Sequence, residues 1–134
     1  PKAFEELRAT LGERIVHFGY AEDFATYASL LAKGDLLPVT SDQDFFGGST
    51  VEAIYCGCYP LLPNQLAYPE HLPQGETEVL YRSYEELIDK MRKAMDQVSQ
   101  LRKKNWQHWV AQYDWHFMSR QYDDKLEQLA KGEW

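Results

Sequence analysis

The sequence predicts an α/β fold in which helices flank a parallel β-sheet. Short apolar, β-rich runs alternate along the chain with segments whose apolar side chains recur at helical spacing. Strands that alternate with helices pair in parallel through crossover connections. The chain has 134 residues, of which 44% are hydrophobic, so it is long enough to bury one core.

The N-terminal part of the chain is expected to contain two helices and two strands. Apolar side chains at helical spacing predict helices over residues 2–12 and 22–33. Apolar, β-rich runs predict strands over 14–19 and 36–40. Pro38 indicates a strand end or a sheet edge, because proline cannot donate a ladder hydrogen bond.

The middle of the chain continues the alternation. A polar loop over 41–48 leads into a short helix over 49–56, which is followed by a strand over 58–62. A second strand is expected at 79–81. The connection between these strands includes a Pro-rich loop over 63–77, and connections of this length are often functional.

The C-terminal part is predicted to be helical. Ser83, with Glu86 three residues later, forms a capping-box pattern that opens a long helix. Its predicted core face consists of Leu87, Met91, Ala94, Met95, Val98 and Leu101. The tail over 106–129 is also predicted to be helical and is unusually aromatic.

Charge and hydropathy exclude some classes of protein. The net charge of −7 disfavours binding of nucleic acid, because the surface as a whole repels a phosphate backbone. No apolar run approaches the roughly 20 residues of a membrane span. Residues 1–6 contain no apolar signal-peptide core, and the absence of a starting Met suggests a chain that was processed or cut from a longer protein.

The two cysteines predict a reducing compartment. Cys56 and Cys58 lie in an apolar stretch, with only one residue between them, a spacing that disulfide geometry disfavours. We therefore expect two buried free thiols and a cytosolic protein. The four histidines do not supply the spacing of a zinc site, so no metal is expected.

The segment from Asp44 to Ala53 is the richest candidate for chemistry. Gly47 and Gly48 allow close approach of a ligand to the main chain, and the following helix start offers unpaired N–H groups and a positive dipole end. These features predict an anion site that suits a diphosphate. Asp44 and Glu52 flank it, and carboxylates bind sugar hydroxyls well, which favours a nucleotide-sugar.

The same residues also admit a purely structural interpretation. Ser49 and Glu52 match a capping box, in which the glutamate reaches back to the serine backbone and stabilises the helix start. Asp44 would then be an ordinary loop acid.

A family resemblance favours the functional interpretation. Asp44–Ala53, followed by Cys56–Pro60, resembles the Glu-x7-Glu signature of retaining glycosyltransferases with the GT-B fold. The preceding elements, a strand ending in Gly19 and another ending at Thr40 and Ser41, agree with this family. The run from Phe45 to Pro60, together with Tyr68–Glu70, is most similar to its tRNA-queuosine mannosyltransferase branch. The resemblance implies a Rossmann-like sheet that forms part of the C-terminal, donor-binding domain.

The resemblance assigns roles to side chains. Asp44 takes the place of the first glutamate, as the catalytic-site acid that touches the donor hexose, although it is one methylene shorter. Glu52 would hold the ribose hydroxyls. Gly19 and Tyr20 fall where the family binds the nucleotide base.

The resemblance also assigns roles to backbone amides. Those around Phe46, Gly47 and Gly48 would meet the sugar. Those of Gly48, Ser49 and Thr50 would meet the diphosphate.

The resemblance further implies a division of the chain. Residues 1–104 would form the partial nucleotide-sugar domain, and residues 105–134 a helical tail that packs toward an N-terminal acceptor domain. Trp115, Phe117, Met118 and Tyr122 would then form an interdomain face, which promotes self-association when its partner is absent. The alternative is that these side chains pack on this domain's own core.

The expected activity is retaining hexosyl transfer from a nucleoside-diphosphate sugar, with no cofactor beyond this donor. The resemblance implies GDP-mannose as donor and queuosine-modified tRNA as acceptor. Alternatives are a retaining enzyme with a saccharide, lipid or small-molecule acceptor, and a non-catalytic nucleotide-binding or interaction module.

Overall fold

The computed structural model describes residues 2–132 and confirms the α/β class. Three short parallel strands, β1 (Leu36–Pro38), β2 (Tyr59–Pro63) and β3 (Leu80–Tyr81), lie side by side in that order. As the sequence predicts, β1 ends at its proline and forms a sheet edge. Pro1, Glu133 and Trp134, which belong to the predicted domain ranges, lie outside the described residues.

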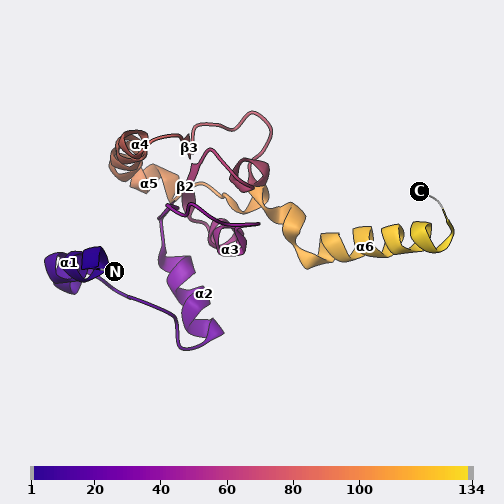
Figure 1. Cartoon of the computed structure of the whole chain (residues 1–134), viewed down its shortest axis with the longest axis horizontal. Coiled ribbons are helices and arrows are strands. Elements are labelled where there is room, and N and C mark those ends of the chain that lie inside the picture. The colour runs from indigo at the N-terminus through magenta and orange to yellow at the C-terminus, as the bar shows by residue number, and fades with distance from the viewer. Residues whose placement is uncertain (1, 133–134) are drawn as a thin grey trace.

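Helices cover both faces of this sheet (Figure 1). On one side lie α2 (Phe24–Lys33) and α3 (Gly48–Tyr55). On the other side lie α4 (Tyr84–Asp96) and α5 (Val98–Leu101). The sheet is thus the middle of three layers, and the loop that enters α3 starts just beyond the end of β1.

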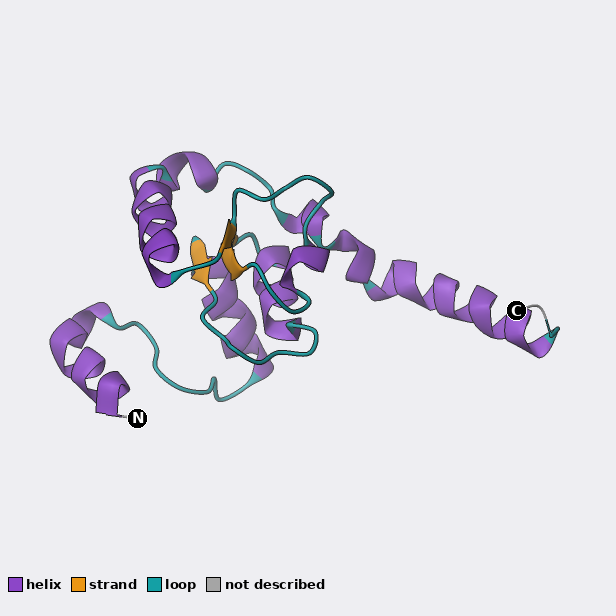
Figure 2. Cartoon of the chain, turned by 45° about the horizontal axis from the view of Figure 1, so that its top comes forward, coloured by secondary structure: helices purple, strands orange, loops and turns teal. Residues whose placement is uncertain are grey.

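Two further helices extend away from these layers. α1 (Lys2–Leu11) and α6 (Trp115–Ala130) project at opposite ends of the molecule, as Figure 2 shows. Among the described residues, no helix combines the length and the apolar character that crossing a bilayer requires. Residues 2–132 also contain four 3₁₀ turns: η1 (Gly12–Arg14), η2 (Tyr68–His71), η3 (Gln107–Trp109) and η4 (Ala111–Tyr113).

The core joins the sheet to α3, α4 and the first part of the aromatic tail. Burial of each large apolar side chain contributes about 1.5–3 kcal/mol, so this cluster dominates the stability of the fold. Trp106 packs at 4.9 Å from Tyr59 and at 5.0 Å from Trp109, measured between ring centroids. The core cluster includes Ile54, Leu62, Val79, Leu80, Ala94, Leu101, Trp106, Trp109 and Val110.

The strand predicted over 14–19 is wrong. After η1 this segment is irregular, and Val16 is 87% exposed. A strand needs a neighbour for its ladder hydrogen bonds, and β1 carries none on its outer edge among the described residues. Phe18 instead packs on α1, against Phe4 and the guanidinium of Arg8.

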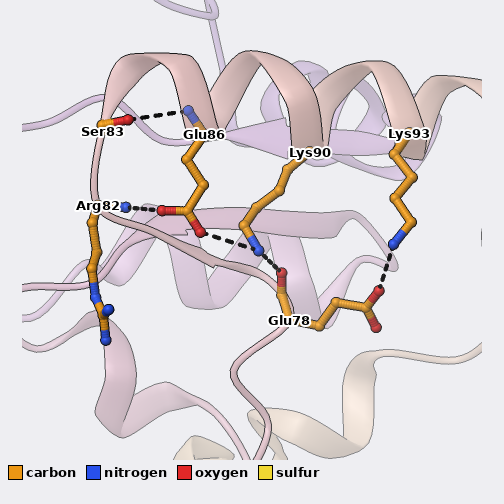
Figure 3. A network of polar contacts seen from close by, with 6 residues as sticks. All are labelled: Glu78, Arg82, Ser83, Glu86, Lys90 and Lys93. Carbon is orange, nitrogen blue, oxygen red and sulfur yellow. Dashed lines mark hydrogen bonds and ion pairs between the residues drawn. The ribbon is translucent and has the colours of Figure 1, made fainter.

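The predicted capping box of α4 is present in a shifted form (Figure 3). Ser83 Oγ accepts from the Glu86 N–H at 3.2 Å, and the Glu86 carboxylate reaches back to the N–H of Arg82, one residue before the cap. Lys90 continues the network, donating to the Glu78 carbonyl at 2.6 Å. These contacts fasten the start of α4 to the strand before it.

Two predictions of burial need correction. Met95 is 58% exposed, because it lies at the border of the apolar stripe, one position past the buried Ala94. Cys56 is an exposed free thiol that ends α3, whereas Cys58 is buried as predicted. The Cys58 thiol donates to the carbonyls of Leu31 and Gly34 at 3.4 Å.

Candidate functional site

The N-terminus of α3 is open to solvent. Gly48 and Ser49 are exposed, and a Cβ atom added at Gly48 would meet no other atom within 4 Å. The N–H of Val51 is the one that bonds back to Gly47, so the amides of Gly48, Ser49 and Thr50 precede the first helical hydrogen bond. Such amides, together with the helix dipole, favour an anion.

The turn before α3 requires glycine. Gly47 caps the helix with a φ of +80°, a left-handed conformation that side chains resist. A Cβ atom there would lie 3.2 Å from Tyr68 and 3.3 Å from His71. The absence of a side chain at Gly47 therefore allows Tyr68 and His71 of η2 to pack directly against the loop.

Asp44 shapes this turn. One of its oxygens accepts from the N–H of Gly47 at 2.7 Å and from that of Phe46 at 3.3 Å. Its other oxygen accepts from the Tyr68 hydroxyl at 3.3 Å. Burial, and then the charge of Asp44, raises the pKa of Tyr68, so this phenol remains a donor. The side chain of Asp44 thus points into the loop that it closes.

His71 is a residue of the site's supporting structure that sequence reasoning missed. It is fully buried, and both ring nitrogens have partners: the Phe46 carbonyl at Nε2 and the Tyr113 hydroxyl at Nδ1. A carbonyl only accepts, so Nε2 carries the proton. The signal available in the sequence was that this histidine follows Pro69 and Glu70 within the long predicted loop.

Glu52 does not form the capping box of the structural interpretation. Gly47 is the cap of α3, and Glu52 instead accepts from the hydroxyl of Tyr27 on α2 at 2.7 Å. Burial, together with the hydrogen bond to Glu52, raises the pKa of Tyr27 to about 12. The carboxylate itself is exposed and able to accept further hydrogen bonds.

Glu52 and Tyr27 border a cavity of about 390 Å³ between α2, α3 and the chain around η4. Cavities of this size hold small ligands. Its lining is mostly apolar and consists of Phe24, Tyr27, Ala28, Leu31, Val51, Glu52, Tyr55, Cys56, Val110, Tyr113 and Asp114. Asp44 does not line this cavity. Of the two predicted acids, Glu52 therefore borders the cavity, whereas Asp44 contacts the loop before α3.

The other predicted site residues divide into two groups. Phe46 lies two residues before the first helical amide, that of Gly48. Its ring packs against His71 and Tyr113 at centroid distances of 5.1 and 5.0 Å. Gly19 and Tyr20 lie in the connection between α1 and α2. Tyr20 is fully exposed and does not line the cavity. Within residues 2–132, no group of His, Cys, Asp and Glu side chains could hold a metal ion.

The exposed start of α3 at Gly48 and Ser49 favours an anion, although Thr50 is buried, and the Glu52 carboxylate can accept hydrogen bonds from hydroxyl groups. No family model and no solved structure matches the chain. Over 91 residues, 68% of this chain, the sequence is 41% identical to a tRNA-queuosine alpha-mannosyltransferase of Drosophila melanogaster. The match spans 23% of that relative's length. This similarity supports a relationship between the chain and a glycosyltransferase.

Proposed function

We propose that this chain is the donor-binding part of a retaining glycosyltransferase with the GT-B fold. The donor is a nucleoside-diphosphate hexose, GDP-mannose, and the acceptor is queuosine-modified tRNA. The single observation that carries this proposal is the 41% identity to a protein named for mannosyl transfer to tRNA-queuosine. The open N-terminus of α3, with Glu52 in its first turns, supports it chemically.

The diphosphate of the donor is proposed to sit on the amides of Gly48, Ser49 and Thr50. Negative charge grows on this group as the glycosidic bond breaks, and fixed N–H groups stabilise it without reorganisation. Glu52 accepts from the ribose hydroxyls, and Gly19 and Tyr20 contribute to the base site.

The hexose is proposed to meet the amide of Gly48 and one oxygen of Asp44. The amides of Phe46 and Gly47, which the resemblance also assigns to the sugar, already donate to Asp44 in the folded chain. Because Asp44 is already bonded to the loop and to Tyr68, it would present the sugar with a carboxylate held in one orientation. This preorganisation would set the hexose for attack by the acceptor.

We also propose that the chain has two parts with different roles. Residues 1–104 would form the nucleotide-sugar domain, and the tail over 105–134 would pack toward an acceptor domain or, in its absence, self-associate. Free Cys56 and Cys58 fit a reducing compartment, so we place the protein in the cytosol.

Titration calorimetry on the full-length protein tests donor binding. GDP and GDP-mannose should bind, UDP-glucose should bind more weakly, and Glu52→Ala should abolish GDP binding. Glu127→Ala, which removes an exposed carboxylate of α6, is the matched control and should bind as the wild type does. If no nucleotide binds, the chain is an interaction module and the proposal fails.

Transfer of labelled mannose identifies the acceptor. Queuosine-modified tRNA should be labelled with retention at the anomeric carbon, and the same tRNA lacking queuosine should not. Labelling of a saccharide or lipid acceptor instead would favour a related enzyme with a different acceptor.

A further inference from the structure

A polar contact beside the proposed site joins two helices. Tyr27 lies one turn into α2, and its hydroxyl donates to Glu52 Oε2 at 2.7 Å, across 25 residues of sequence. Both side chains border the apolar cavity. Within the described part of the chain, no second hydrogen bond holds the Glu52 carboxylate.

We infer that Tyr27 is a positioning residue, which fixes the Glu52 carboxylate so that its free oxygen meets the ribose diol of the donor. This inference rests on the proposed function and adds a residue to it. Glu52 is exposed, and an exposed glutamate samples many rotamers. A bond to a half-buried phenol restricts it to one orientation before the ligand arrives, which lowers the entropy that binding must remove.

The surroundings of Tyr27 suit this role. Its ring is half-buried and borders the apolar cavity between α2 and α3, so the fold restricts where its hydroxyl can lie. The phenol stays protonated throughout the physiological range and donates continuously, since burial raises its pKa to about 12. Phe24 packs beside it, at a centroid distance of 6.4 Å.

The inference predicts a specific change in ligand discrimination. Calorimetry on the full-length protein compares GDP with its analogue that lacks both ribose hydroxyls. Hydrogen bonds to a charged group are worth about 1.5–3 kcal/mol, so wild-type protein should favour GDP by roughly tenfold or more. Tyr27→Phe should reduce this preference severalfold, while the ratio of GDP to GMP affinity, which reports the diphosphate, stays unchanged.

Tyr55→Phe is the matched control. Tyr55 borders the same cavity, but its hydroxyl donates to Asp114 at 3.3 Å and not to Glu52. It should keep the wild-type preference for the ribose hydroxyls. In a Glu52→Gln background, Tyr27→Phe should cause no further loss, because the carboxylate that it positions is gone.

The outcomes separate this inference from the proposed function. If wild-type protein does not bind GDP, both fail. If it binds GDP and discriminates against the analogue, but Tyr27→Phe keeps that preference in full, only the inference fails. A parallel loss for GDP, GMP and the analogue would identify Tyr27 as a structural residue and overturn the inference as well, with the thermal melting of each variant showing that it folds.

Discussion

Gly47 is the residue on which the geometry of the α3 N-terminus depends most. Its φ of +80° strains any side chain, and an added Cβ atom would lie 3.2 Å from Tyr68 and 3.3 Å from His71, so these neighbours would have to shift. We expect Gly47→Ala to lower the free energy of unfolding by about 1–3 kcal/mol, through backbone strain and displacement of η2. Urea unfolding measures this change.

Gly48→Ala provides the control at the neighbouring position. Gly48 has no positive φ, and an added Cβ atom meets open space. Within a helix, alanine is favoured over glycine, so stability should stay constant or rise by up to about 1 kcal/mol. Equal destabilisation by both substitutions would contradict the importance of the left-handed turn.

Because of Tyr27, the free energy of unfolding should depend on pH in the alkaline range. Its pKa is about 12 in the folded chain, against about 10 when unfolded. Above pH 10 the unfolded state loses its proton first, so the free energy of unfolding falls as the pH rises from about 10 to 12. Burial raises the pKa of Tyr59 to about 12 as well, so Tyr27→Phe should reduce this slope without removing it.

Urea unfolding at a series of pH values between 9 and 12 would measure the slope. Tyr20→Phe, at a fully exposed ring, is the matched control and should leave the wild-type slope intact. A Tyr27→Phe slope identical to that of the wild type would show that the Tyr27–Glu52 contact does not persist in solution.

At the scale of elements, the start of α4 depends on one cap. Ser83 is the N-cap of this helix, and its side chain accepts from the N–H of Glu86 in the first turn. Ser83→Ala should therefore lower the free energy of unfolding by about 1 kcal/mol. Ser99→Ala, at an exposed position in α5, should change it by less than about 0.5 kcal/mol. Equal effects would exclude capping as the cause.

The sequence predicted most elements because their signals are local. The spacing of apolar residues located α2 and α4, Pro38 marked the end of β1, and Ser83 marked the start of α4. The strand over 14–19 failed for the opposite reason. Its apolar, β-rich pattern is genuine, but a strand also requires a partner, which no local pattern reveals.

The candidate site was predictable only in part, for a related reason. Asp44, Gly47 and Glu52 belong to one short motif and can be found by its spacing. Tyr27 and His71 reach the same motif from residues about 25 positions away, through contacts that only the folded chain creates. Local reasoning thus finds the residues of the motif and misses the distant residues that contact it.

At the scale of the whole molecule, α6 has an apolar face that no other part of the described chain covers. Trp115, Met118, Tyr122, Leu126 and Leu129 fall within about a quarter of the helix circumference. Trp115 is 68% exposed and Leu126 61%, and the helix projects away from the sheet in both views (Figures 1 and 2). Of the two alternatives from the sequence, packing of this helix on the domain's own core is therefore wrong.

An exposed apolar stripe of this kind should promote association of the 134-residue chain with itself. We expect its weight-average mass in sedimentation equilibrium to rise with concentration. The pair Tyr122→Lys and Leu126→Lys should suppress this rise, because it places two charges on the stripe. Asp124→Lys adds the same two units of charge on the opposite side of α6, and should leave association unchanged. Both changes bring the net charge from −7 to about −5, which weakens repulsion between copies, so net charge alone would not suppress association. Equal suppression by the pair and by Asp124→Lys would exclude the stripe as the contact.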